Sequence, residues 1–195
     1  DAADYTGLTD VGLYDLTLCN GVTMYFPSST YLYQHLQGAI ASTNPGGIVF
    51  LGDVRSLSHQ LLFHMRKLIH IENVSRADVY KAGLVSRAKD KDRCYDHHMF
   101  YDMHTRGMLP GVAAVEIQIK RGKHSSEFTR YRYDVVFHLS KDRSAEPPAP
   151  LPVRKAAGTE MMECAAVVAA LTAAGPTEDD VVVCSNVVNT RVLAD

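Results

Sequence analysis

No stretch of this sequence reaches the roughly 18 consecutive apolar residues that a membrane-spanning helix needs. The opening residues, DAADYTGLTD, are acidic and show no signal-peptide pattern. Neither sign of charge dominates, since 20 Lys and Arg residues accompany 22 Asp and Glu residues for a formal net charge of −2. We therefore expect no membrane and no nucleic acid among the partners. What remains is a chain of 195 residues, 46% of them hydrophobic, which is long enough for one globular domain with a sizeable core.

Cysteine is scarce, and no two cysteines form a C-x-x-C pair. The four lie far apart, at Cys19, Cys94, Cys164 and Cys184. In a chain with a core of its own, this spacing favours reduced thiols and a cytoplasmic location over a disulfide framework. The chain also begins without methionine, so we interpret it as a piece of a longer protein.

The first third of the chain alternates between strand and helix patterns. Residues 16–19 predict a short apolar strand, and residues 27–30 (PSST) a turn and helix cap, followed by apolar residues at helical spacing. Residues 44–47 (NPGG) indicate a turn, and residues 48–51 (IVFL) a buried parallel strand that ends at Gly52-Asp53. A second helix should face inward with Leu61, Leu62, Met65, Leu68 and Ile69. Strand, helix, strand and helix with short polar links predict an α/β fold.

An antiparallel hairpin is predicted further along. VAAVEIQIKRG and FTRYRYDVVFHLS alternate apolar and polar positions, and residues 122–126 (GKHSS) join them. Glu127, Arg130, Tyr131, Tyr133 and Asp134 belong to this hairpin, and the alternation of residues 130–134 (RYRYD) indicates by default a half-solvated strand. Residues 72–108, before the hairpin, are charged and weakly patterned.

Composition divides the chain into three parts. Residues 1–143 carry the strands, helices and hairpin described above. Residues 144–158 are rich in proline and predict a linker. Residues 159–195 predict a terminal helix, at 159–174, and a strand at 180–185.

Several segments resemble one enzyme family in the same order. LYDLTLCNGVTMYFPSSTYL resembles F-D-x-V-V-x-N-S-V-V-Q-Y-F-P, and PGGIVFLGDVRSL resembles P-G-G-x-x-F-V-G-D-V-R-S-L. EFTRYRYDVVFH is similar to E-L-T-R-F-R-Y-D-V-V-L-H, and SNVVNTRVLAD to a closing segment that commonly reads I-P-N-A-R. These are motifs of the S-adenosylmethionine-dependent N-methyltransferase domains embedded in nonribosomal peptide synthetases.

The resemblance implies a fold, a reaction and partners. The fold would be the carboxyl-terminal half of a class I (Rossmann-like) methyltransferase sheet with an antiparallel terminal hairpin. The glycine-rich loop that cradles the cofactor would precede Asp1. The reaction would move a methyl group from S-adenosylmethionine to the amine of a carrier-protein-bound aminoacyl group, beside an adjoining adenylation domain.

The same resemblance carries site residues over to this chain. The opening Asp4 and Tyr5 match an acidic turn that flanks the adenine. Asn20, Gly21 and Val22 match the bend that lies across the methionine end of the cofactor. In open α/β sheets ligands lie beyond the carboxyl ends of the strands, so we expect catalytic roles for three residues there: Asn20, Tyr25 and Asp53.

Other interpretations remain open. The family motif has Ser and Gln where this chain has Gly21 and Met24, so the chain could be a non-catalytic remnant that keeps the fold for a structural or interaction role. Met24, Tyr25 and Phe26 could line a pocket or belong to the core. A metal-binding module would have to use Cys94, His98, Asp102 and His104, whose spacing matches no zinc pattern, so we expect no metal site. An unpaired strand at residues 16–19 would make the isolated chain poorly stable or oligomeric.

Overall fold

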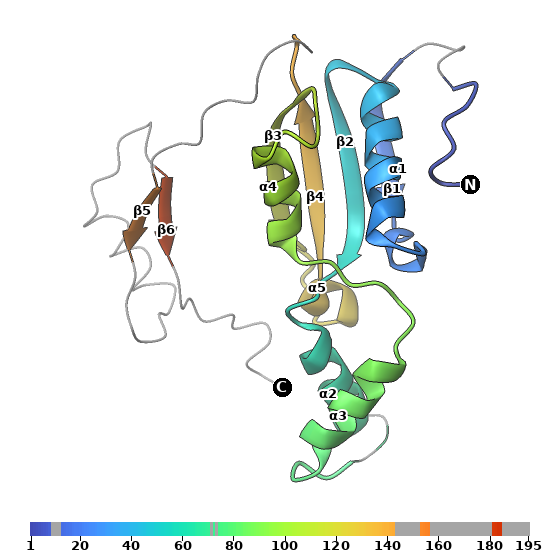
Figure 1. Cartoon of the computed structure of the whole chain (residues 1–195). Coiled ribbons are helices and arrows are strands. Elements are labelled where there is room, and N and C mark those ends of the chain that lie inside the picture. The colour runs from blue at the N-terminus through green and yellow to red at the C-terminus, as the bar shows by residue number, and fades with distance from the viewer. Residues whose placement is uncertain (9–12, 71, 73, 143–152, 157–180, 185–195) are drawn as a thin grey trace. The chain divides into compact units, whose positions relative to one another are not determined.

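The structure is a computed structural model that describes residues 1–8, 13–70, 72, 74–142, 153–156 and 181–184 (Figure 1). It divides into two compact units, Asp1–Pro148 and Ala149–Asp195, which are considered separately. None of the described helices is long and apolar enough to cross a membrane.

A mixed four-stranded sheet forms the centre of the first unit. Its strands are β1 (Tyr14–Asn20), β2 (Thr43–Arg55), β3 (Val112–Ile119) and β4 (Arg132–Leu139). They lie in the order β1-β2-β4-β3, so β4 is inserted between β2 and β3. β1 and β2 are parallel, and β4 runs antiparallel to both of its neighbours. The α/β class and the antiparallel terminal hairpin are therefore confirmed.

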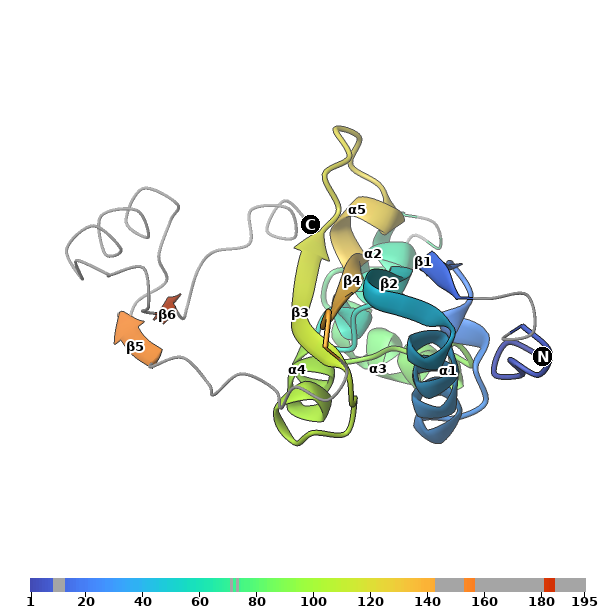
Figure 2. The ribbon, with the colours of Figure 1, turned by 90° about the horizontal axis from the view of Figure 1, so that it is seen from above.

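Helices α1 (Ser29–Ala41) and α4 (His97–Thr105) lie on the same side of this sheet (Figure 2). Ser28 begins α1 as predicted, because its side chain accepts a hydrogen bond from the amide of Tyr31. The fully buried side chains include Leu36 of α1, Phe100 of α4 and Phe137 of β4. The core therefore lies between the two helices and this face of the sheet.

The opposite face of β1 is open. β1 is the edge strand of the described sheet, and its Leu16 and Leu18 side chains are 55% and 61% exposed. Side chains alternate along a strand, so the same strand buries Cys19 on the core side. The exposed apolar edge predicted at residues 16–19 is confirmed.

β2 is longer than the sequence predicts. Residues 44–47 belong to the strand although they were expected to form a turn, and the strand continues through Gly52-Asp53 to Arg55. The register with β4 shifts between Leu51 and Val54, where Asp53 has a φ of 59°. The glycine and aspartate therefore make a bulge rather than a strand end, because the neighbouring strand pairs on both sides of them.

Residues 72–108 contain two helices that the pattern did not predict, α3 (Val79–Lys89) and α4. α3 packs against α2 (Gln60–His70), and both lie beyond the carboxyl ends of β1 and β2 in Figure 1. In α2 the expected inward face is only partly right, because Leu62 is 40% exposed whereas His64 is buried.

Two further short helices surround the strand ends. Val22 precedes the 3-10 helix η2 (Thr23–Tyr25). α5 (Glu127–Tyr131) takes the place of the beginning of the predicted second hairpin strand, because Ser126 and Thr129 form a capping box that starts a helix there.

The second unit has two described strands, β5 (Val153–Ala156) and β6 (Val181–Cys184), which pair in parallel. β6 falls within the predicted strand at 180–185, and β5 falls within the range 144–158 that we expected to be a linker. The predicted helix at 159–174 lies outside the described residues.

Candidate active site

The end of β1 carries the first two predicted site residues. Asn20 pairs with Gly52 of β2, and the amide of Gly21 donates a 3.0 Å hydrogen bond to the carbonyl of Gly52. A Cβ atom added to Gly52 would lie 1.9 Å from Oδ1 of Asn20. The Asn20 side chain therefore lies directly on the Gly52 backbone, and only glycine leaves room for it.

Asp53 follows Gly52 and is held by two partners. Its amide donates a 2.9 Å hydrogen bond to Oδ1 of Asp134. Nζ of Lys120 lies 2.7 Å from Oδ1 of Asp53 and 2.7 Å from Oδ1 of Asp134. These contacts stabilise a positive φ that costs a residue other than glycine about 1 kcal/mol or more. Partial burial alone would lower the pKa of Lys120, but its hydrogen bonds to Asp134 and Asp53 and their charges outweigh burial and raise it.

Asp53 faces the turn at the end of β1. Its Oδ2 lies 4.0 Å from the position of a Cβ on Gly21. The structure thus brings together three predicted residues, Asn20, Gly21 and Asp53. Sequence reasoning did not single out Lys120, and it treated Asp134 as an ordinary hairpin residue, because nothing local shows that β4 lies beside β2.

The residues after this turn separate into core and surface. Met24 and Phe26 are 4% and 5% exposed, and the Phe26 ring packs edge-on against Tyr31 and His35. Tyr25 between them is 69% exposed. The alternative between pocket and core is therefore resolved differently for each: Phe26 belongs to the core, Tyr25 borders a pocket, and the buried Met24 contributes to the wall of that pocket.

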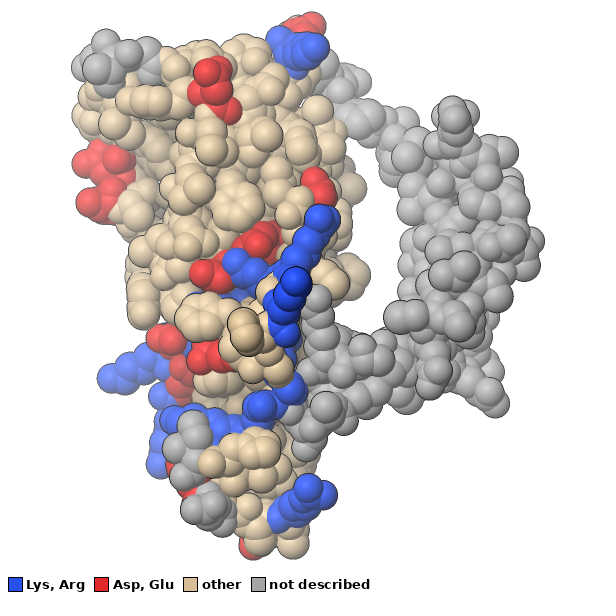
Figure 3. Space-filling view, turned by 180° about the vertical axis from the view of Figure 1, so that it is seen from behind, with Lys and Arg blue, Asp and Glu red and all other residues tan. Residues whose placement is uncertain are grey.

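That pocket, of about 460 Å³, lies at the end of β2 and is bordered by α2, α3 and α5. Figure 3 shows Lys and Arg side chains gathered over the half of the molecule that holds these helices. Apart from Met24, Tyr25 and Phe63, every residue that lines the pocket is polar or charged. Pockets for small molecules are usually lined mainly by apolar side chains, so this one is unusual.

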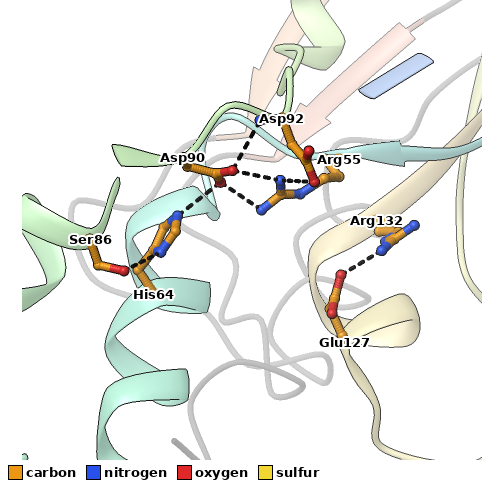
Figure 4. A network of polar contacts seen from close by, with 7 residues as sticks. All are labelled: Arg55, His64, Ser86, Asp90, Asp92, Glu127 and Arg132. Carbon is orange, nitrogen blue, oxygen red and sulfur yellow. Dashed lines mark hydrogen bonds and ion pairs between the residues drawn. The ribbon is translucent and has the colours of Figure 1, made fainter. Parts of the chain in front are cut away.

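A network centred on Arg55 crosses the pocket (Figure 4). The guanidinium lies 2.9 Å from Oδ2 of Asp90 through Nη2 and 2.9 Å from Oδ2 of Asp92 through Nη1. It also lies over the Phe63 ring, 5.0 Å from its centre. On the other side of the network, Nη2 of Arg132 lies 2.5 Å from Oε1 of Glu127.

His64 extends this network into the helices. Its Nε2 lies 3.0 Å from Oδ2 of Asp90, and its Nδ1 lies 2.9 Å from Oγ of Ser86 on α3. Burial alone would raise the pKa of Asp90, but its hydrogen bonds from Arg55, the Asp92 amide and His64, with the charge of Arg55, outweigh burial and lower it. Ser86, His64 and Asp90 are the residue types of a catalytic triad. Here, however, Oδ2 of Asp90 also binds Arg55 of β2, so we interpret these contacts as structural: they connect α2 and α3 to β2. The sequence did contain a signal that His64 is buried, since it lies three residues after Leu61 and four before Leu68, on the apolar face of the helix.

The predicted adenine-side residues lie elsewhere, against α1. The Tyr5 ring covers Gly38, where an added Cβ would be 2.2 Å from it, and its hydroxyl is 3.1 Å from Nδ1 of His35. Burial raises the pKa of Tyr5 to about 12. Asp4 is exposed and accepts a hydrogen bond from the amide of Thr6. The contacts described for Asp4 and Tyr5 are thus with α1 and with Thr6, and none of them is with the Asn20–Gly21 turn.

The histidine-rich stretch groups differently from the set considered above. Among the described residues, potential metal-ligand atoms come within 4.8 Å of one another in Asp96, His97 and His98. Cys94 stands outside this group, and burial raises the pKa of its thiol to about 11. Both Cys94 and Cys19 are free thiols.

Sequence comparison relates the chain to very large proteins. No protein-family model matches it. It is 31% identical over 140 residues to chondramide synthase of Chondromyces crocatus, a match that covers 71% of this chain and 4% of that protein. It is 30% identical over 145 residues to a nonribosomal peptide synthetase of Emericella nidulans, covering 72% of this chain and 5% of that protein. The chain therefore spans only about a twentieth of the length of these curated relatives.

Among solved structures, the chain is similar to an O-methyltransferase family protein from Burkholderia thailandensis, with 12% identity, a TM-score of 0.41 and coverage of 72% of this chain and 34% of that one. It is also similar to the N-methyltransferase NodS from Bradyrhizobium japonicum, with 14% identity, a TM-score of 0.32 and coverage of 66% and 52%. The chain is thus related in part to nonribosomal peptide synthetases.

Proposed function

We propose that this chain is part of an S-adenosylmethionine-dependent methyltransferase domain of a nonribosomal peptide synthetase. The reaction is transfer of a methyl group to the amine of a carrier-protein-bound aminoacyl group, and an adenylation domain adjoins the domain. The observation that carries the proposal is the meeting of Asn20 and Gly21, at the carboxyl end of β1, with Asp53 in the bulge near the carboxyl end of the parallel strand β2. That edge is where open α/β sheets bind ligands.

The residues present fit one end of such a cofactor. The Asn20 side chain offers both a donor and an acceptor, and its exposure leaves it free to meet the amino-acid portion. Gly21 has no side chain and a φ of 68°, so its backbone can approach a ligand closely. Val22 would border the same portion of the ligand, whereas Asp4 and Tyr5 are assigned to the adenine side by resemblance. When bound, the cofactor supplies an electrophilic methyl group.

The chain's own residues then position the acceptor. Methyl transfer requires the acceptor nitrogen to be held in line with the methyl group, and such alignment contributes several kcal/mol to lowering the barrier. We assign Asp53, which Lys120 and Asp134 fix in place, and the exposed ring of Tyr25 to the acceptor side of the turn. Lys120 holds Oδ1 of the Asp53 carboxylate, and Asp134 holds the backbone amide of Asp53.

Transfer of a labelled methyl group from S-adenosylmethionine to an aminoacyl thioester tests the proposal in the complete protein. N20A and D53N should each lower the rate of transfer about tenfold or more, since N20A removes a hydrogen-bonding side chain and D53N removes a negative charge at the reacting end. K123M, which changes an exposed lysine of the hairpin link, is the matched control and should retain the wild-type rate. A folded protein that neither binds the cofactor nor transfers the methyl group would instead support the non-catalytic interpretation.

A further inference from the structure

The pocket at the end of β2 shares Tyr25 with the proposed acceptor side of the turn, and the residues that line it indicate what it can bind. Asp92 and Glu127 each use one carboxylate oxygen in the ion pairs of Figure 4, through Oδ2 to Arg55 and through Oε1 to Arg132. Within the described part of the chain, neither Oδ1 of Asp92 nor Oε2 of Glu127 has a hydrogen-bond partner. Both carboxylates are partly exposed, at 39% and 38%. The pocket therefore presents two oriented acceptors.

Arg132, which also lines the pocket, has a donor without a partner among the described residues. The Arg132 side chain is only 11% exposed, and its Nε is buried without a hydrogen-bond partner among the described residues. One face of its guanidinium is covered by the Phe128 ring, whose centre lies 4.2 Å away. A buried N–H without a partner costs about 1–3 kcal/mol, and a ligand atom that accepts from it would recover that cost. Lys89 adds a second donor to the wall of the pocket.

We infer that this pocket binds the acceptor, and that the acceptor is an aminoacyl group with a polar, hydrogen-bond-accepting side chain. The inference rests on the proposed function and extends it to the class of substrate. The charged form of the amine would bind the free oxygens of Asp92 and Glu127, and the exposed Tyr25 ring adds a face that attracts cations. One of these carboxylates would take a proton from the nitrogen, whose free electron pair can then bond to the methyl group as the methyl–sulfur bond breaks. The side chain would accept from Nε of Arg132. An aliphatic side chain would leave that N–H unpaired, and sites built for a polar group reject analogues that lack it.

Aminoacyl N-acetylcysteamine thioesters provide the probes, with binding to the complete protein measured by calorimetry and methylation measured in a single turnover. The glutaminyl and seryl thioesters should bind and react about tenfold or more better than the leucyl and valyl thioesters. N-acetylation of the amine should abolish binding. Equal or better binding of the aliphatic probes would overturn the inference.

Conservative variants separate the two halves of the pocket. D92N and E127Q should each weaken all free-amine probes about tenfold, because a charged partner of the amine is lost. R132K keeps a positive charge beside Glu127 but lacks the Nε donor, so it should remove the preference for polar side chains and leave the need for a free amine unchanged. K123M is again the control, and thermal melts show whether each variant is folded. A full polar preference in R132K contradicts the inference.

The two proposals fail in different ways. Methyl transfer that is insensitive to all three substitutions would overturn the pocket assignment and leave the proposed function standing. Binding of polar aminoacyl probes in the pocket, without any cofactor binding or transfer, would overturn the proposed function and leave the pocket assignment standing.

Discussion

Replacing Lys120 with methionine tests the charged cluster that fixes Asp53. The ammonium group lies 2.7 Å from a carboxylate oxygen of Asp53 and 2.7 Å from one of Asp134, so it separates two negative charges. Methionine keeps most of the apolar stem of lysine but removes the charge. The carboxylates of Asp53 and Asp134 would then repel each other, and Asp53 itself already has a strained backbone conformation.

The magnitude follows from the exposure of the cluster. The side chains of Lys120, Asp53 and Asp134 are 21%, 17% and 13% exposed. They lie between an exposed pair, which is worth about 0–1 kcal/mol, and a buried pair, whose loss of one partner costs about 3–5 kcal/mol. We expect K120M to lower the free energy of unfolding by about 2 kcal/mol. With a urea m-value of about 2 kcal/mol/M, the midpoint falls by about 1 M.

Urea unfolding followed by circular dichroism at neutral and acidic pH measures this effect. Because the pKa of Lys120 is raised in the folded protein, the stabilisation that Lys120 provides is complete below pH 10.5, the ordinary pKa of lysine. It is lost only as the pH rises through the higher pKa of the folded state. K123M should match the wild type at both pH values. A K120M midpoint within about 0.2 M of the wild type would refute the bridging role of Lys120.

Three other expectations follow from the same structure. G52A should lower the free energy of unfolding by about 1–3 kcal/mol, because its Cβ would overlap Asn20, and the cost measured by urea unfolding should shrink in an N20A background; equal costs in both backgrounds would contradict the contact. Because the pKa of Asp90 is lowered, its contribution to stability is present above 3.8 and is lost as the pH falls through the folded value; acid titration should show a steeper loss in the wild type than in D90N, and identical profiles would exclude Asp90 as the cause. The double variant L16K/L18K should self-associate less than the wild type in analytical ultracentrifugation, since charge on an exposed strand opposes pairing; a wild type that is monomeric at all concentrations would rule out this role for the edge.

Local patterns predicted several elements well because they depend on near neighbours. The cap at Ser28, the apolar spacing of α1 and the alternation of β3 all arise within a few residues, and each is confirmed. Gly52-Asp53 shows the limit of this reasoning, because the same dipeptide suits either a strand end or a bulge. Its conformation depends on whether a neighbouring strand continues past it, which β4 does. His64 was not among the residues expected to face inward, although its position belongs to the apolar face of α2 and it is buried.

The sequence alone determined the α/β class, the parallel pair of strands, the antiparallel hairpin and the polar turn at Asn20 and Gly21. The tertiary structure decided that β4 lies between β2 and β3, which brings Lys120 and Asp134 to Asp53. It also decided that α2 and α3 stand over the strand ends, where Arg55, Asp92 and Glu127 line one pocket. The reason is physical: caps and periodicity act over a few residues, whereas strand order and helix docking depend on contacts between segments far apart in the chain, which no local pattern records.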